Sequence, residues 1–151
     1  MSSITPFQLP DTINSDTKPA TIEFNNEILL VYKGNKGDTD IYFSSSPDGQ
    51  SWNGTSKTNN LAPASSGPSL VMFNGAIYAF FLSTADSNIH YFQTTDGKNW
   101  GNNSPLPALV NSSQPPSPIV IGSRLYLIYK GSGNDSRMFM VYTQDGVNWS
   151  S

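Results

Sequence analysis

The sequence has no cysteine and few charged residues, and each shortage excludes a class of protein. Without cysteine there are no disulfides and no thiolate chemistry. Lys and Arg number eight against eleven Asp and Glu, with no basic run, so we expect no nucleic-acid partner, which would need a basic stripe to neutralise phosphates. No apolar run approaches the length of about 18 residues that spans a bilayer, so we expect no membrane insertion.

Targeting and metal-binding signals are also missing. The N-terminal stretch MSSITPFQLPDTIN has neither a basic start nor an apolar core, so no secretory signal is expected. Localisation is therefore undetermined: cytoplasmic by default, with release by a signal-independent route left open. No spacing typical of metal ligands is present, and we expect no cofactor and no metal. With 12 Gly and 11 Pro, the composition favours strands joined by turns.

What the sequence does contain is one unit written three times. SPDGQSW, TTDGKNW and TQDGVNW each place an Asp-Gly pair ahead of a tryptophan, and the copies are 48 and 49 residues apart. Each is preceded by an apolar run, a short turn, a second apolar run, a polar loop and a third apolar run. Such a unit is typical of a propeller blade. The sequence predicts an all-β fold of three four-stranded repeats, at about 1–52, 53–100 and 101–149 in a single domain.

The N-terminal segment predicts how the blades assemble. Residues 8–19 align without a gap with residues 105–116, which follow the second tryptophan. We therefore expect the N-terminal segment to be the outer strand of a blade that lacks one. Three blades are too few to close a ring, and an open arc would expose apolar faces. The sequence predicts a homodimer with six blades, in which each N-terminal strand completes the partner's last blade.

The three turns resemble the Asp-box of sialidase-type propellers, a Ser/Thr-x-Asp-x-Gly-x-Thr-Trp hairpin, although here Gly directly follows Asp. The resemblance implies a structural motif away from the active face, with direct ligand contact as the alternative. The chemistry agrees, because Asp accepts hydrogen bonds within its own turn, Gly supplies a positive φ and Trp packs against the blade. The residues assigned to this motif are Asp48, Gly49, Trp52, Asp96, Gly97, Trp100, Asp145, Gly146 and Trp149.

Catalytic residues are not evident in the sequence. A sialidase needs an arginine cluster, but Arg124 and Arg137 are the two arginines and occupy different positions of one repeat. Other propeller glycosidases use inner-strand carboxylates, and the inner-strand segments offer Glu23 and Glu27 alone. His90 aligns with strand residues of the other repeats and is interpreted as a packed side chain. We therefore expect no catalytic residue and a protein that is not an enzyme.

The repeated aromatic strands also resemble lectins in which short propeller chains combine into one ring with glycan sites between blades. The resemblance implies multivalent glycan binding. Aromatic, charged and amide side chains recur on the loop face opposite the Asp-Gly turns, and these suit sugar rings and hydroxyls. Alternatives are blade packing for each residue, and a non-catalytic scaffold or a portion of a larger glycosidase-like or toxin propeller for the chain. The candidate ligand-binding residues are Tyr32, Lys33, Asp38, Asp40, Asp86, Asn88, Tyr129, Lys130, Asp135 and Arg137.

Overall fold

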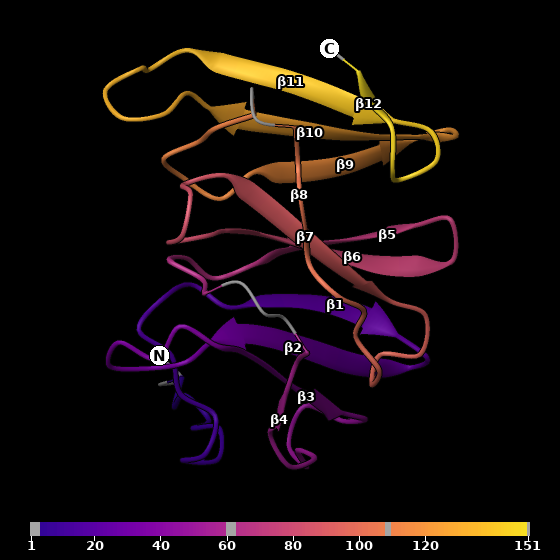
Figure 1. Cartoon of the computed structure of the whole chain (residues 1–151). Coiled ribbons are helices and arrows are strands. Elements are labelled where there is room, and N and C mark those ends of the chain that lie inside the picture. Colours follow the sequence, from indigo (N-terminus) through magenta and orange to yellow (C-terminus); the bar gives the residue numbers. More distant parts are fainter. Residues whose placement is uncertain (1–3, 60–62, 108–109, 151) are drawn as a thin grey trace.

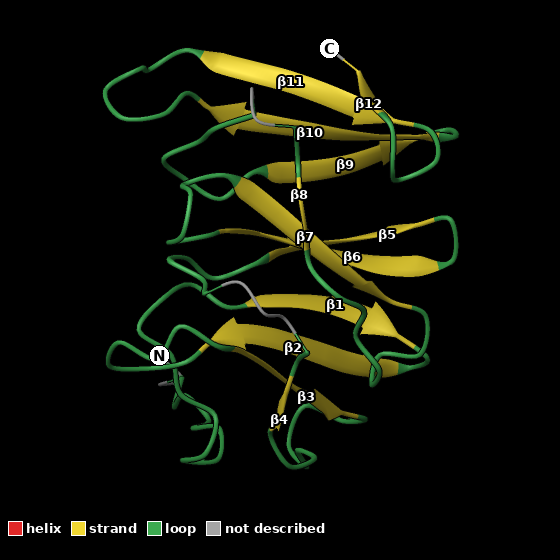
Figure 2. Ribbon diagram, in the orientation of Figure 1, coloured by secondary structure: helices red, strands yellow, loops and turns green. Residues whose placement is uncertain are grey.

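The chain folds into three antiparallel sheets of four strands each. The computed structural model describes residues 4–59, 63–107 and 110–150, and this part of the chain consists of strands and loops (Figure 2). Each sheet is a meander of consecutive strands, and the three sheets are stacked in chain order in Figure 1. Four-stranded meanders stacked in this way are propeller blades, which confirms the predicted fold class.

The strands follow the apolar runs of the sequence. Blade 1 contains β1 (Ala20–Phe24), β2 (Glu27–Lys33), β3 (Ile41–Ser46) and β4 (Ser56–Lys57). Blade 2 contains β5 (Ser69–Phe73), β6 (Ala76–Leu82), β7 (Ile89–Thr94) and β8 (Ser104–Pro105). Blade 3 contains β9 (Ser117–Ile121), β10 (Arg124–Lys130), β11 (Met138–Thr143) and β12 (Trp149–Ser150).

Two-residue turns set the register of the inner hairpins. Asn25 and Asn26 join β1 to β2 with φ values of 53° and 63°, and Asn74 and Gly75 join β5 to β6 with 48° and 77°. Two successive positive φ values are typical of the type I′ turn that matches the twist of a hairpin. Because side chains alternate along a strand, this register decides which residues face the preceding blade and which face the next.

The hydrophobic core lies between the blades. All seven residues of β6 are buried, because the middle blade is covered on both faces. The equivalent strand β10 in blade 3 alternates between buried and more exposed residues, because only one of its faces is covered. The buried residues between blades 1 and 2 include Leu29, Val31, Ile41, Ile77, Phe81, Phe92 and Trp100. Those between blades 2 and 3 include Phe73, Tyr78, Phe80, Ile89, Leu125, Leu127 and Tyr129.

The tryptophan of an Asp-Gly turn packs against the preceding blade. Trp100 is 4% exposed, and its ring centroid lies 5.1 Å from that of Phe92 and 6.0 Å from that of Phe43 in blade 1. Trp149 makes the equivalent contact with Tyr91 of blade 2, at 6.2 Å, and also contacts Phe80, at 6.0 Å. Trp52 belongs to the first blade and is half-buried. The turns thus join one blade to the one before it.

Each Asp carboxylate holds its own turn together. In the second turn, the carboxylate of Asp96 accepts hydrogen bonds from the backbone N–H groups of Lys98 and Asn99, at 2.8 and 2.7 Å. Asp48 accepts the same pair of bonds, and the N–H of Ser51 is the chief cause that lowers the pKa of Asp48 to about 2. The pKa values of Asp96 and Asp145 are lowered further in the same way, because hydrogen bonds stabilise the charged carboxylate.

The outer strands differ between the blades. β4 and β8 pair with the first half of the third strand, at Tyr42–Phe43 and His90–Tyr91 respectively. β12 instead pairs with the last two residues of β11, beside the turn. The N-terminal segment 4–19, expected as an outer strand, lies before β1 and contains no strand. Residues 108–109 of the segment to which it aligns lie outside the described residues.

The contact between turn and blade predicts unequal costs for two glycine substitutions. Gly146 (φ 79°) and Gly75 (φ 77°) both have left-handed backbones, in which alanine is strained by roughly 1–2 kcal/mol. A Cβ on Gly146 would also collide with the hydroxyl of Tyr78, whereas none of the described atoms lies within 4 Å of a Cβ on Gly75. We expect Gly146→Ala to lower the free energy of unfolding by roughly 1–3 kcal/mol more than Gly75→Ala, measured by urea denaturation. Equal losses would contradict the packed turn.

The turn carboxylates also predict loss of stability in acid. A carboxylate whose pKa is lower in the folded state stabilises the fold above its unfolded pKa of about 4, and this contribution is lost as pH falls toward the folded value. For Asp48 the window runs from about pH 4 to about pH 2. We expect Asp48→Asn to melt below the parent at pH 7 and the gap in melting temperature to close by about pH 2. A gap independent of pH would contradict this role.

Candidate functional site

A hollow of about 740 Å³ lies where the three inner strands begin, and we call it the axial hollow. Each blade contributes the equivalent segment, namely 17–21, 65–70 and 114–118. The inner strand β5 lies against both β1 and β9, so the three segments meet at one end of the blades. In Figure 1 the inner strands begin on the left, and the Asp-Gly turns lie on the right. The axial hollow is therefore at the opposite end from the Asp-Gly turns.

The lining of the axial hollow is mostly uncharged and combines polar and apolar groups. Serine and threonine hydroxyls, prolines and the amide of Gln114 predominate, and Lys18 is the single charged side chain among its described lining residues. The backbone is held tightly here: Ser69 Oγ donates to the carbonyl of Pro116 at 2.6 Å, and a Cβ on Gly67 would collide with the carbonyl of Lys18. Such a rim offers fixed donors and acceptors to an uncharged ligand.

Inner-strand carboxylates lie away from the hollow. Glu23 is exposed near the far end of β1, and its carboxylate accepts a hydrogen bond from the backbone N–H of Asn26 at 3.0 Å. Glu27 begins β2 on the other side of the same turn. Neither residue lines the axial hollow as described.

Two of the predicted ligand residues of blade 1 line a smaller pocket. This blade 1 pocket of about 270 Å³ contains Tyr32 and Asp38 together with Tyr42 and the amides Asn14 and Asn35. The rings of Tyr32 and Tyr42 are stacked, with centroids 6.0 Å apart, and Tyr42 donates to Asp38 at 2.9 Å. That bond raises the pKa of Tyr42 because it stabilises the protonated phenol.

Sequence reasoning missed Tyr42, Asn14 and Asn35 as pocket residues. One signal was available for Tyr42: it faces Tyr32 across the predicted pair of strands, a register that the structure has. The amides had no such signal, because Asn14 comes from the N-terminal segment, whose position against blade 1 depends on tertiary packing.

The predicted lysines bind their own loops. Lys33 is 5% exposed, and its ammonium donates to the carboxylate of Asp16 at 2.8 Å and to the carbonyl of Gly34 at 3.2 Å. Lys130 Nζ donates to the carbonyls of Gly131, Gly133 and Asp135, at 2.9–3.3 Å. Both ammonium groups thus have partners that hold the loop after the second strand, and neither lines the blade 1 pocket.

The recurring loop aspartates cap the third strand of each blade. Asp38, Asp86 and Asp135 accept a hydrogen bond from the backbone N–H two residues later, at 2.9–3.0 Å. Those N–H groups belong to the predicted residues Asp40, Asn88 and Arg137. The common Asx turn is a structural reason for the recurrence.

The predicted group of blade 3 is held together by its own charges. Arg137 donates two bonds to Asp135, at 2.9 and 2.8 Å, and thereby lowers the pKa of Asp135 to about 2. Tyr129 is 6% exposed and belongs to the core between blades 2 and 3. The buried Tyr129 and the exposed Arg137 both contact Phe139: the ring of Tyr129 stacks on it with centroids 5.7 Å apart, and the guanidinium of Arg137 lies 5.4 Å from its centroid. In blade 1, Asp40 forms an ion pair with Lys57.

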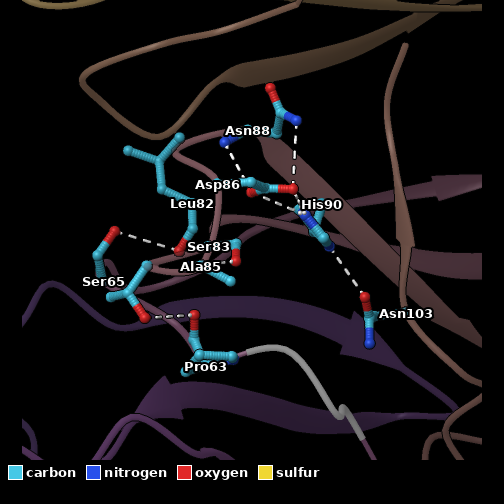
Figure 3. A network of polar contacts seen from close by, with 10 residues as sticks. Pro63, Ser65, Leu82, Ser83, Ala85, Asp86, Asn88, His90 and Asn103 are labelled. Atoms are coloured by element: carbon cyan, nitrogen blue, oxygen red, sulfur yellow. Dashed lines mark hydrogen bonds and ion pairs between the residues drawn. The ribbon is translucent and has the colours of Figure 1, made fainter. Parts of the chain in front are cut away.

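Blade 2 carries a network of polar contacts around the loop between β6 and β7 (Figure 3). His90 is 7% exposed; Nε2 lies 3.0 Å from a carboxylate oxygen of Asp86, and Nδ1 lies 2.9 Å from the side-chain oxygen of Asn103. Burial opposes ionisation of Asp86, but the bonds from His90 and Asn88 outweigh it and lower its pKa. The loop is further tied down by Ser65, which donates to the carbonyl of Leu82. His90 thus has partners for both ring nitrogens.

Other kinds of site are not formed by the described residues. No group of three or more His, Asp and Glu side chains among them is arranged to hold a metal ion. Within the same ranges, no helix is long and apolar enough to cross a membrane.

The stacked blades and the axial hollow define a three-blade section of a β-propeller. The chain belongs to the family of the DUF6242 beta propeller domain, whose family model matches residues 8–151. No curated protein is similar enough to this sequence to count as a match.

Solved structures of carbohydrate-active enzymes share the fold. The family 117 glycoside hydrolase Zg3597 of the marine bacterium Zobellia galactanivorans has a TM-score of 0.70 at 15% identity, over 87% of this chain and 44% of that one. An exo-β-1,3-galactanase of Phanerochaete chrysosporium has a TM-score of 0.67 at 13% identity, over 88% and 34%. The endosialidase of phage phi92 has a TM-score of 0.60 at 14% identity, over 87% and 25%. The chain therefore spans less than half the length of each.

These similarities correct the expectation that the protein is not an enzyme. The similar structures include glycoside hydrolases of families 117, 43 and 32, so this chain shares its fold with enzymes. The expectation was wrong because it relied on the absence of the arginine cluster that sialidases need. It also considered inner-strand carboxylates from these three blades alone. The predicted resemblance to sialidase-type propellers is confirmed for the propeller fold, which the endosialidase shares.

Proposed function

We propose that the three blades are a portion of a glycoside hydrolase-like propeller ring and that the axial hollow binds carbohydrate. The observation that carries this proposal is the hollow itself, to which all three blades contribute an equivalent segment. Ligand sites in proteins are concave and combine apolar surface with a few fixed polar groups. The glycoside hydrolases that share the fold support the same class of ligand.

The lining chemistry suits an uncharged sugar. A serine or threonine hydroxyl both donates and accepts a hydrogen bond, and the Gln114 amide does the same with separate atoms, so these groups match sugar hydroxyls. The proline rings offer apolar surface to the C–H groups of a sugar. Lys18 adds one donor.

Hydrolysis would require carboxylates in addition to this lining. Glycoside hydrolases generally place a pair of carboxyl groups on either side of the bond that breaks. Glu23 and Glu27 lie away from the axial hollow, so the carboxylates for hydrolysis of a sugar bound there would have to come from other blades of the ring.

A bulky substitution in the hollow tests carbohydrate binding. Ser117 is exposed and lines the hollow, so Ser117→Trp fills it, whereas Gln50→Trp places the same side chain in an exposed turn at the opposite end. We expect the parent and Gln50→Trp to bind one of a panel of xylan, β-1,3-galactan and fructan oligosaccharides in calorimetric titrations. Ser117→Trp should bind it at least about tenfold more weakly, a loss of about 1.4 kcal/mol. Equal binding by both variants would contradict the proposal.

The blade 1 pocket supports a second candidate, a lectin-like site for a single sugar. Its volume of about 270 Å³ is combined with two stacked tyrosines, a carboxylate and two amides, which are groups that hold a sugar ring and its hydroxyls. The expected glycan partner is the same class as for the axial hollow, but the two sites lie on different parts of the chain.

One loop offers a matched test of the lectin site. Asn35 lines the blade 1 pocket, whereas Lys36 next to it is exposed and does not. We expect Asn35→Ala to weaken binding of a monosaccharide roughly tenfold, through loss of a hydrogen bond to a sugar hydroxyl, and Lys36→Ala to leave it unchanged. NMR titration with galactose, xylose and fructose measures both. Loss in Ser117→Trp without loss in Asn35→Ala would reject the lectin site.

A further inference from the structure

Blade 3 exposes the face that the other blades bury. Ile119 and Ile121 of β9 are 50% and 64% exposed, and Met140 of β11 is 50% exposed. Their equivalents in blade 2 include Val71 and Phe73, which pack in the core between blades 2 and 3. Apolar side chains that lie exposed next to one another on one face of a sheet are typical of a surface that binds another protein surface.

The same blade has an open strand edge. Tyr91 of β7 pairs with the outer strand β8, whereas the described residues provide no outer strand for Phe139 and Met140 at the equivalent position of β11. Leu106, just beyond β8, donates its backbone N–H to Ile89 at 2.9 Å and is 2% exposed. Among the described residues, β12 therefore pairs only with the last two residues of β11, and none covers the β11 edge at Phe139–Met140 or takes the place of Leu106.

The N-terminal segment has the conformation of the missing piece. The N–H of Ile13 donates to Pro10 at 2.8 Å, as that of Val110 donates to Pro107 at 2.8 Å. Ser15 then forms the same side-chain turn as Ser112, each hydroxyl accepting the N–H two residues later at 3.1 Å. The turns at residues 10–13 and 15–17 are thus closed by the same hydrogen bonds as those between Pro107 and Val110 and between Ser112 and Gln114.

The segment after β8 packs between blades 2 and 3, whereas among the described residues the equivalent N-terminal segment has no blade before it to cover. Val110 is 4% exposed in the core between blades 2 and 3, but the equivalent Ile13 is only half-buried, as is Leu9. Phe7, which aligns with the first residue of β8, is 64% exposed. Trp52 is likewise half-buried, while Trp100 packs against a preceding blade. One end of the chain therefore carries the features that the open face of blade 3 lacks.

We propose that a second copy of this chain docks head to tail on blade 3. Residues 7–8 of the second copy add an outer strand to β11 at Phe139–Met140, and Leu9 and Ile13 of that copy cover the apolar face. Trp52 of that copy takes the place that Trp149 has against blade 2. Two such junctions close a ring of two chains. The ring also completes the axial hollow, yet its formation does not depend on what the hollow binds.

A second copy fits better than an unrelated partner because both open surfaces are on this one chain. The junction has already formed twice, between blades 1 and 2 and between blades 2 and 3, with equivalent residues on each side. An added strand satisfies the backbone groups of the β11 edge, and apolar contacts bury the face.

The oligomeric state of charge variants is the first test. We expect the parent to be a dimer, at twice the 16.4 kDa chain mass, in sedimentation velocity at micromolar concentration. Ile121→Asp and Leu9→Asp should each be monomers. In a dimer of either variant, each junction would contain one aspartate carboxylate removed from water. Val147→Asp, at a turn residue that is 71% exposed, is the control and should remain a dimer. A parent monomer, or variants that still dimerise, would overturn the proposal.

Mixing the two variants tests the head-to-tail arrangement. In a mixed pair, one junction carries both aspartates and the other carries neither, so we expect the mixture to recover dimers that neither variant forms alone. Recovery also shows that both variants are folded. Continued monomers in the mixture would point to contact between like faces, or to further blades of one longer polypeptide as the natural cover.

A disulfide test gives an independent readout, since the chain has no cysteine of its own. Gln8 aligns with Pro105, which pairs with His90, so Gln8 of one copy should face Phe139 of the other. We expect Gln8→Cys with Phe139→Cys to form a covalent dimer on oxidation, and Gln8→Cys with Val147→Cys to form none. A covalent dimer that binds no carbohydrate would overturn the proposed function and leave the assembly standing.

Discussion

Burial of one blade against the next is the interaction on which the rest of the structure depends. A four-stranded blade has two faces, and its strands carry apolar side chains toward both of them. β6 is buried along its whole length because blade 2 has a neighbour on each side, while β10 alternates because blade 3 has one. The core therefore does not exist within a blade, and stability comes from stacking blades in the correct register.

The Asp-Gly turns provide that register at one end of the blades and leave the other end free for a ligand. The carboxylate fixes the turn, the glycine allows close approach to the preceding blade, and the tryptophan packs against it. The axial hollow at the opposite end is lined by the starts of the inner strands, which are held by backbone contacts between blades. The turns that hold the blades together and the axial hollow thus lie at opposite ends of the blades, so that loop residues at the hollow can differ without loss of the core.

The proposal that the axial hollow binds carbohydrate rests on two separate observations, the lining of the hollow and the proteins that share the fold. Hydroxyls, an amide and prolines form a mostly uncharged lining, and the similar structures are glycoside hydrolases. The prediction of a non-enzyme went wrong because it relied on the missing arginine cluster of sialidases and on the few carboxylates and the one histidine of these three blades. Chemistry on a propeller is a property of the completed ring, and three blades show only part of it.

The sequence by itself determined the blades. Asn74-Gly75 and the three Asp-Gly pairs specify tight turns through local backbone preference, and the apolar runs between them specify the strands. Only the tertiary structure decided which polar residues meet. Lys33 and Lys130 were predicted as ligand residues, but Lys33 donates to Asp16 and Gly34 and Lys130 donates to its own loop. Asn14 reaches the blade 1 pocket from the N-terminal segment. The physical reason is that turns and strands depend on neighbours in sequence, whereas the partners of a loop side chain depend on how blades and the N-terminal segment pack in space.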